Sequence, residues 1–473
     1  VFLPVVFILY WFITDKYLKA QNILIVLASY FFYAWWDWRF LSLILFSTSV
    51  DYFVGLALEK TDNMSKRKML IWTSIIVNLG LLGFFKYYNF FLENFVNTFT
   101  LFGGELRYNS LYIILPVGIS FYTFQTLSYT IDIYKGKLKP TRNFIVFAAF
   151  VSFFPQLVAG PIERAKNLLP QFLIKRKFDY NLAVDGLRQI LWGLFKKMVI
   201  ADNCAVYVDE FFGNHEMYDG STLLIGAFFF TIQIYCDFSG YSDIAIGVSR
   251  LFGFNLMKNF AFPYFSRNIG EFWRRWHISL TTWFKDYVYI PLGGSRGSKL
   301  MQLRNTFIIF LVIGLWHGAH WKFVIYGFIN ALHFVPFILF GKNTKYKNSV
   351  ASGNLLPSLK DVFNILKILT FLVLVRVFFR ADDLTTAISY LSEIFSISIF
   401  KIPRFNNMAG ALITFVLIIL FICVEWIGRE QNYALEKIGS NWKRIYKWGF
   451  YYIIIFCIFY FYAKQQKFIY FQF

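Results

Sequence analysis

Long apolar runs recur from one end of the chain to the other, separated by short polar and basic segments. An α-helix of about 20 mostly apolar residues is long enough to cross the bilayer core. The runs are continuous rather than alternating, which predicts helices and not the strands of a membrane barrel. We expect about eleven full spans and two or three partial ones. The clearest lie at residues 1–13, 22–36, 40–58, 69–86, 111–131, 303–316, 321–340, 361–380, 408–427 and 446–463.

The composition leaves no room for a separate soluble domain. The chain has 473 residues, 58% of them hydrophobic and 16% charged, and its mean hydropathy is +0.51. A soluble protein of this length carries about 25% charged residues. We therefore predict an all-α polytopic membrane protein with a single membrane-embedded domain over residues 1–473. The apolar run at its start is expected to be a first spanning helix rather than a cleaved signal.

The net charge of +20 is carried by loops between apolar runs. Two basic loops, at residues 59–68 and 135–142, fall on one side if the spans alternate, and the positive-inside rule makes that side cytoplasmic. The charge is thus explained by membrane topology and anionic membrane lipid, not by nucleic acid. Some of these residues could also hold a phosphate-bearing donor at the cytoplasmic face.

One apolar segment, residues 144–158, does not fit a simple crossing. A full crossing would place the following basic stretch, residues 175–177, on the outer side. Pro155 and the Gly160-Pro161 pair also interrupt a helix here. We expect a broken or re-entrant segment that returns to the cytoplasmic side and lines a substrate path, because non-helical backbone at membrane depth must be buried in protein or face a cavity.

Charged side chains occur inside two further apolar segments. Lys196 and Lys197 interrupt the helical run 182–207 and are expected at a membrane interface, with their stems snorkelling. Asp237 and Asp243 lie within the run 222–251. Carboxylates inside a membrane are rare and face the protein interior or a wet cavity. The pair is either a helix-breaking polar knot that orders neighbouring helices or a direct substrate contact.

Residues 273–287 form an amphipathic pattern when they are placed on one helix. Six apolar residues, five of them aromatic, fall within an arc of about 100° on such a helix. Arg274, Arg275 and Asp286 point elsewhere, and His277 lies at the edge of the apolar arc. An aromatic face opposite cations is typical of a membrane interface. A plain anchor would explain everything except His277.

His317 follows the apolar run 307–315 and is flanked by Trp316 and Gly318. A histidine placed there is expected to stay neutral, so it can take a proton as a general base. The glycine would allow a substrate to come close. The alternative is a core histidine with a structural role. His320 is one turn away without an acidic third ligand, so we predict no metal site. His333 can join His317 only if the chain breaks near Gly318.

Five motifs occur together within residues 155–335. They are PQLVAGPI at 155–162, FSGYSD at 238–243, FWRRWH at 272–277, WFKDYVYIPLGG at 283–294 and GLWHG at 314–318. With them the sequence resembles the membrane-bound O-acyltransferase family, most of all its bacterial alginate O-acetylation branch. The resemblance implies a ring of tilted helices around a central tunnel. It also places the invariant histidine of the family at His317, whereas many relatives carry Asn in place of His277.

The resemblance further implies a function at a bacterial inner membrane. Donors in the family are acyl thioesters, so acetyl-CoA on the cytoplasmic side is the expected donor, and no bound cofactor is expected. The acceptor would be an extracytoplasmic polysaccharide, such as alginate or a cell-wall glycan, or an esterase-like transferase that serves as the partner protein. D-alanyl transfer to teichoic acid, a transporter of an acyl carrier and a non-catalytic scaffold are the alternatives.

The predicted site combines the two lines of reasoning. His317 and His277 are the candidate catalytic residues: His317 removes the proton of an acceptor hydroxyl, and the segment around His277 positions the donor or stabilises developing charge. The basic face near Arg274, Arg275 and Arg296 would guide the donor. The candidate substrate-binding residues are Arg274, Arg275, Trp276, Asp286, Trp316, Asp237, Asp243 and His333.

Overall fold

The architecture is helical throughout the part of the chain that the structure describes. A computed structural model describes residues 1–473 except 104–109, 342–345, 463–465, 467 and 470–473, and no β-strand occurs in the described part. Seven helical stretches there are long and apolar enough to cross a membrane. The predicted class, an all-α polytopic membrane protein, is confirmed. The number of such stretches is smaller than the eleven or so spans expected.

Part of that difference comes from stretches that contain more than one helix. One of the seven extends over 42 residues, Leu18–Glu59, which at about 1.5 Å per residue is roughly twice the thickness of a bilayer core. Asp37 interrupts it with extended backbone (φ −158°, ψ 109°) and caps the short turn that follows through the backbone N–H of Arg39. The stretch therefore consists of two helices, as the sequence predicted.

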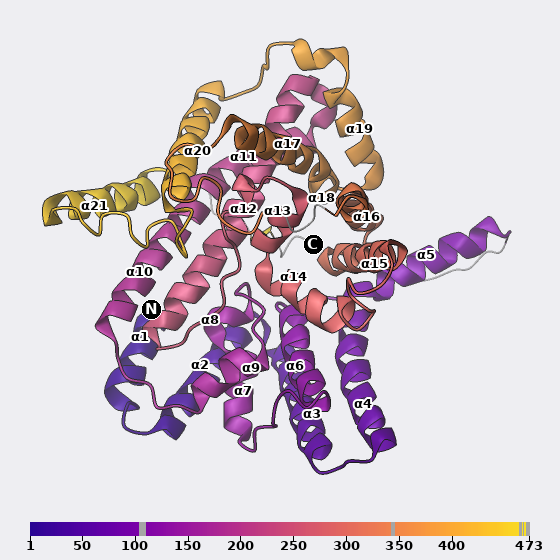
Figure 1. The fold of residues 1–473 in the computed structure, drawn as a ribbon, viewed down its shortest axis with the longest axis vertical. Coiled ribbons are helices and arrows are strands. Elements are labelled where there is room, and N and C mark those ends of the chain that lie inside the picture. Colours follow the sequence, from indigo (N-terminus) through magenta and orange to yellow (C-terminus); the bar gives the residue numbers. More distant parts are fainter. Residues whose placement is uncertain (104–109, 342–345, 463–465, 467, 470–473) are drawn as a thin grey trace. The chain divides into compact units, whose positions relative to one another are not determined.

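The contacts within the chain define two compact units, Val1–Gly186 with Val248–Met257, and Leu187–Gly247 with Lys258–Phe473. Each is described by itself. The helices of the first unit are α1 (Phe2–Ile8), α2 (Leu18–Asp37), α3 (Leu41–Glu59), α4 (Met64–Leu82), α5 (Tyr88–Leu101), α6 (Ile119–Tyr134), α7 (Phe144–Ser152), α8 (Phe154–Leu157) and α9 (Ala165–Leu168), shown in the indigo to magenta part of Figure 1.

Helices α3, α4 and α6 pack around a buried carboxylate. Asp51 is fully buried; it accepts hydrogen bonds from the hydroxyl of Ser74 at 2.5 Å and from the side-chain amide of Asn78 at 2.8 Å. The hydroxyls of Thr126 and Thr130 extend this network to α6. Polar side chains that bond across helices hold spans together where the hydrophobic effect between helices is weak.

The break predicted in the segment 144–158 is present. Helix α7 ends at Ser152, Phe153 leaves helical geometry (φ −49°, ψ 104°), and the four residues of α8 follow with Pro155 in their first turn. Gln156 and Gln125 of α6 exchange amide hydrogen bonds in the interior of the unit. The broken backbone is thus buried in protein, which is the condition under which a membrane protein tolerates it.

The second unit contains the motif-bearing helices. They are α10 (Tyr180–Leu194, in this unit from Leu187), α11 (Asp202–Gly213), α12 (Gly220–Leu251, in this unit up to Gly247), α13 (Ile269–Arg275), α14 (Ile278–Phe284), α15 (Lys299–His317), α16 (Trp321–Leu339), α17 (Leu359–Val375), α18 (Val377–Arg380), α19 (Leu384–Ile394), α20 (Met408–Gly428) and α21 (Arg444–Tyr460). In its most apolar window α12 is 83% buried, more than any other candidate span in the described part of the chain.

Helices α15 and α16 form a hairpin whose backbones touch (Figure 1). A Cβ atom at Gly314 would lie 2.2 Å from the carbonyl oxygen of Phe323, and one at Gly327 would lie 2.2 Å from that of Phe310. Small residues allow this close approach of two helices in a membrane. The hairpin fixes the end of α15, where His317 lies.

Candidate active site

His277 lies at a sharp corner between two short helices, not within one helix. Helix α13 ends at Arg275, Trp276 is extended (φ −99°, ψ 128°), and His277 adopts the left-handed conformation (φ 43°, ψ 55°) before α14 begins. The prediction of a single helix over 273–287 was therefore wrong. The corner is fixed by tertiary bonds, because the backbone N–H of Ile278 donates to the carbonyl of Asn259 at 2.8 Å.

The hydrogen bonding of His277 assigns its tautomer. The ring Nδ1 accepts the backbone N–H of Leu280 at 3.4 Å and so caps α14. Burial lowers the pKa of His277 to about 3, and the side chain is almost completely inaccessible to solvent. The imidazole is thus neutral at physiological pH, and its proton is carried by Nε2. This atom can donate a hydrogen bond but cannot act as a base.

A single indole connects the two candidate catalytic histidines. The ring of Trp316 meets that of His277 nearly edge to face, with centroids 5.8 Å apart, and Trp316 immediately precedes His317. On its other side His277 contacts the ring of Phe238 of α12, at 4.6 Å. The start of α14 and the end of α15 therefore meet, and both histidine motifs contribute to one buried region.

The surroundings of His317 are almost entirely aromatic. Its side chain is buried at the last position of α15, and its ring lies 5.1 Å from Phe379 of α18 and 6.3 Å from Tyr326 of α16. A Cβ at Gly318 would lie 2.2 Å from the ring of Phe323. Packing against Phe323 thus accounts for the glycine, which the sequence analysis had assigned to substrate approach.

Arg274 and Arg275 hold a neighbouring loop. Arg274 donates to the carbonyl of Tyr346 at 2.7 Å, and Arg275 donates to that of Asn348 at 3.2 Å. Arg275 also forms an ion pair with the buried Glu271 at 3.0 Å. In this structure both arginines stabilise the protein itself.

Trp276 stacks inside a group of aromatic rings beneath a buried arginine. The Arg376 guanidinium lies 4.5 Å above its ring, and Phe272 stacks on it at 5.5 Å. Arg376 is buried and donates to the hydroxyl of Tyr264 and to the carbonyl of Thr231. The sequence analysis missed Arg376, although a cation within the apolar run 361–380 was a visible signal.

Asp237 and Asp243 are ion-paired inside the protein. Lys197 lies 2.7 Å from Asp237 and 2.7 Å from Asp202, and Lys196 lies 2.5 Å from Asp243. The two lysines are almost fully buried. Their predicted place at a membrane interface was therefore wrong.

A local change of helix type accounts for the buried position of Lys196 and Lys197. Phe195–Ala201 form a π-helix that carries both lysines between α10 and α11, and such turns are frequent at functional sites. Asp237 and Asp243 themselves lie on α12, which continues unbroken through them, so they do not break the helix. The pairing favours the structural interpretation of the two carboxylates.

The remaining predicted residues lie in different surroundings. Asp286 is partly exposed and lies 3.7 Å from Lys285. His333 packs on Phe371 of α17, with ring centroids 4.0 Å apart. The chain does break after His317, but His333 lies roughly 18 Å along α16 from its first residue, Trp321. The break therefore does not give the two histidines common ring contacts in the described part of the chain.

A small apolar cavity lies beside the rings that surround Trp276. Its volume is 130 Å³, and its lining includes Tyr235, Tyr264 and Glu425. Glu425 accepts hydrogen bonds from the hydroxyl of Tyr235 at 2.6 Å and from the indole of Trp192 at 3.0 Å. Tyr235 and Tyr264 each lie 6.2 Å from the ring of Trp276. Glu425 was not predicted, although it is a single carboxylate in the apolar run 408–427.

Two histidine motifs meet in one buried aromatic region of a helical protein with seven candidate membrane spans in its described part, which is the arrangement of a membrane-embedded enzyme. Residues 137–376 match the sequence model of the membrane-bound O-acyltransferase family. The chain belongs to this family, and it is an O-acyltransferase embedded in a membrane.

Relatives with named activities agree with this assignment. The chain is 39% identical to "Probable alginate O-acetylase AlgI" of Pseudomonas aeruginosa, over 91% of this chain and 80% of the relative. It is 33% identical to the peptidoglycan O-acetyltransferase of Helicobacter pylori, over 100% of this chain and 95% of the relative. The teichoic acid D-alanyltransferase of Bacillus subtilis is 31% identical over 49% of this chain and 61% of its own length.

Proposed function

We propose that this protein transfers an acetyl group from a cytoplasmic thioester, acetyl-CoA, to a polysaccharide hydroxyl on the other side of a bacterial inner membrane. The observation that carries the proposal is the meeting of His277 and Trp316, which brings the two histidine motifs to one buried place. The names of the alginate and peptidoglycan O-acetylating relatives support acetyl as the acyl group and a polysaccharide as the acceptor.

In the proposed reaction the two histidines have different roles. His317 takes the proton of the acceptor hydroxyl, and the hydroxyl oxygen attacks the thioester carbonyl carbon. The electron pair of the C=O bond moves onto its oxygen, which the Nε2–H of His277 stabilises. Collapse of this intermediate breaks the C–S bond. The thiolate then takes the proton from His317, so that an ester and a free thiol result.

The structure supports this division of roles through the state of His277. Its Nδ1 accepts the hydrogen bond that caps α14, so the hydrogen of the neutral ring lies on Nε2, which is the atom that can donate. A neutral donor in a region without bulk water stabilises a developing oxyanion strongly, because the local dielectric is low.

The acceptor side is proposed to involve a second protein. A hydroxyl that reaches the buried histidines can belong to the polymer itself or to a serine of an esterase-like transferase, which then passes the acetyl group to the polymer. The chemistry at His317 is the same in both cases. The two routes differ in whether an acetylated protein accumulates when polymer is absent.

The test is release of CoA and transfer of label from acetyl-CoA to the acceptor by purified protein in lipid, with and without an extract of the extracytoplasmic compartment. We expect turnover by the wild-type protein that depends on His317 and on the extract. Unchanged turnover in His317→Ala, with normal folding, would contradict the proposal. Preference for a D-alanyl thioester over acetyl-CoA would replace acetyl transfer with D-alanyl transfer.

A further inference from the structure

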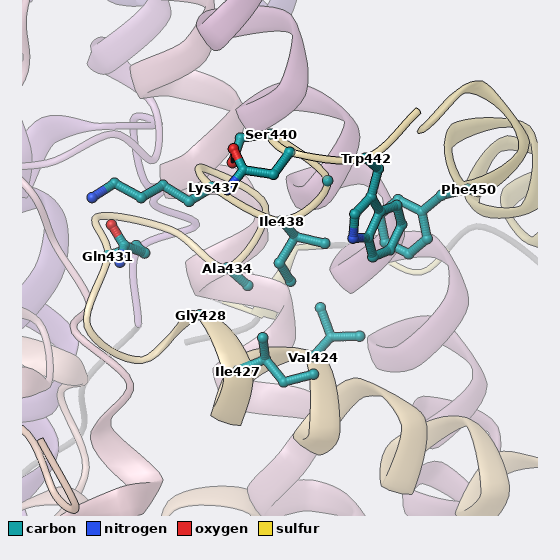
Figure 2. A pocket seen from close by; sticks show the side chains of 12 residues that line it. Val424, Ile427, Gly428, Gln431, Ala434, Lys437, Ile438, Ser440, Trp442 and Phe450 are labelled. Carbon is teal, nitrogen blue, oxygen red and sulfur yellow. Dashed lines mark hydrogen bonds between the residues drawn. The ribbon is translucent and has the colours of Figure 1, made fainter. Parts of the chain in front are cut away.

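A second cavity lies far along the chain from both histidine motifs, where α20 ends and α21 begins. Figure 2 shows it between the last turn of α20, the loop 429–443 and the side chain of Phe450 on α21. Its volume is 380 Å³, which is within the range of about 300–1,000 Å³ for small-molecule sites. Neither the proposed reaction nor its residues use this cavity.

One end of the cavity is apolar and belongs to a membrane span. Val424 and Ile427 project into it from α20, and Phe450 and Trp442 close one side with their rings 5.6 Å apart (Figure 2). Helix α20 has a mean hydropathy of 2.6 over its most apolar window, of which only 33% is buried within the protein. The apolar end of the cavity is therefore continuous with a helix surface that faces lipid.

The other end is polar and basic. Lys437, Ser440 and Gln431 line it, and all come from the loop that follows α20 (Figure 2). Five basic and two acidic residues lie between Arg429 and Lys447. Arg429 is turned inward, since its guanidinium donates to the carbonyls of Val350 and Trp426. The charge available to a ligand at this end is thus that of Lys437, which is exposed and lines the cavity.

Helix α21 adds the signature of a membrane interface beside the cavity. It begins with Arg444 and Lys447, and most of its apolar and aromatic side chains, including Trp448, Tyr452 and Phe456, are exposed. Aromatic residues next to cations are typical of the level of the lipid headgroups. An apolar slot below a cationic rim at this level matches an amphiphile with a negatively charged head.

We propose that this cavity is a binding site for an anionic phospholipid. The phosphate group would lie at the rim near Lys437 and Ser440, and an acyl chain would lie against Val424, Ile427 and Phe450. The apolar end favours a lipid over free phosphate, because inorganic phosphate gains nothing from that surface. The positive charge of Lys437 favours an anionic lipid over a zwitterionic one.

Native mass spectrometry of the full-length protein, released from nanodiscs, tests the proposal. Phosphatidylglycerol and phosphatidylcholine with the same acyl chains are supplied at equal amounts, with and without excess inorganic phosphate. We expect retention of one phosphatidylglycerol in preference to phosphatidylcholine, and no competition by inorganic phosphate. Equal retention of both lipids, or displacement of the lipid by phosphate, would overturn the proposal.

Two pairs of variants locate the site. Val424→Trp fills the apolar end, and Val416→Trp places the same side chain on an exposed position of α20, where it is the control. Lys437→Gln removes one charge at the rim, and Lys360→Gln is its control on an exposed lysine of α17. We expect Lys437→Gln to lower retention about fivefold, the size of one basic residue at an anionic surface.

Lipid retention by each variant is compared with retention by its own control. Loss of retention in Val424→Trp and Lys437→Gln, with wild-type retention in both controls, supports the site. Equal effects within a pair would mean that the lipid binds elsewhere, and this result overturns the proposal. Lys437→Gln changes an exposed side chain, so it keeps the test decisive even if Val424→Trp destabilises the fold.

Discussion

The indole of Trp316, near the end of α15, lies against the imidazole of His277, at the corner before α14, at an interplanar angle of 79°. Trp316 is attached to His317 through the chain, so a shift of the corner at His277 is transmitted to the end of α15. The aromatic contact is worth about 0.5–1.5 kcal/mol beyond the area that it buries. Side-chain packing therefore contributes to the relative position of the two histidines.

Replacement of His317 by Gln tests its role as a base. Gln keeps a polar side chain of similar size but cannot accept and return a proton. We expect acetyl transfer to fall by about 10²–10⁴, the range for loss of a general base, with little change in the thermal unfolding midpoint. His215→Gln is the control, since His215 lies in the short turn His215–Met217, away from both histidine motifs in sequence. A His317→Gln variant with more than a tenth of wild-type turnover would refute this role.

Two substitutions of His277 distinguish its structural role at the corner from a catalytic role. Asn tolerates the left-handed backbone at φ 43° and can cap α14 with its side-chain oxygen, while its amide still donates a hydrogen bond. Ala supplies neither function. We expect His277→Asn to keep the fold and much of the activity, and His277→Ala to lose roughly 1–2 kcal/mol of stability with the cap and about 10²–10³ in turnover. Equal turnover of the two variants would show that no donor is needed there.

Burial of His277 also predicts how stability depends on pH. The folded-state pKa is lowered to about 3 from 6.5, so the unfolded chain binds more protons between these values. The stabilisation by the neutral buried ring is fully present above pH 6.5 and is lost as the pH falls toward 3. At pH 5 the loss is about 2 kcal/mol. Lowering the pH from 8 to 5 should therefore lower the thermal unfolding midpoint of the wild type more than that of His277→Asn. If the midpoints of the two proteins fall in parallel with pH, the low pKa assigned to His277 is contradicted.

The helices could be predicted from apolar periodicity because bilayer thickness and backbone hydrogen bonding leave few alternatives. Two local features escaped that reasoning. The corner at His277 depends on hydrogen bonds that Ile278 and Ser279 donate to Asn259, which lies outside the segment, and the periodicity of 273–287 carries no sign of them. The inward turn of Lys196 depends on a π-helix, which shifts side chains relative to the regular spacing assumed for an α-helix.

The tertiary contacts of the site residues could not be predicted from local sequence patterns either. Single-residue chemistry made His317 and His277 candidates, since histidines in apolar surroundings are conspicuous. It did not reveal that Arg274 and Arg275 are engaged by the loop at Tyr346 and Asn348, because such contacts follow only from tertiary structure. Arg376 could have been found by asking of each lone charge in a span what it pairs with.

The buried ion pairs around α12 predict that replacement of Lys197 strongly lowers the stability of the fold. Lys197 lies between Asp237 and Asp202 in the protein interior, and its removal leaves two buried carboxylates without their cation. We expect Lys197→Met to destabilise the fold by about 3–5 kcal/mol. Lys401→Met is the matched control, because Lys401 and Asp219 form an exposed pair, for which a loss of about 1 kcal/mol or less is expected. Chemical unfolding in detergent measures both, and similar losses would contradict the prediction.

The close crossing of α15 and α16 predicts that alanine destabilises the protein at Gly314 but not at Gly80. Gly314→Ala would place a Cβ 2.2 Å from the Phe323 carbonyl oxygen, so the two helices must separate. Because His317 lies one turn further along α15, we expect a loss of stability of about 1–3 kcal/mol together with reduced acetyl transfer. Gly80→Ala is the control, since nothing lies within 4 Å of a Cβ at that helical position, and Ala favours helices over Gly by about 1 kcal/mol. Equal stability of the two variants would mean that the helices are not in backbone contact at Gly314.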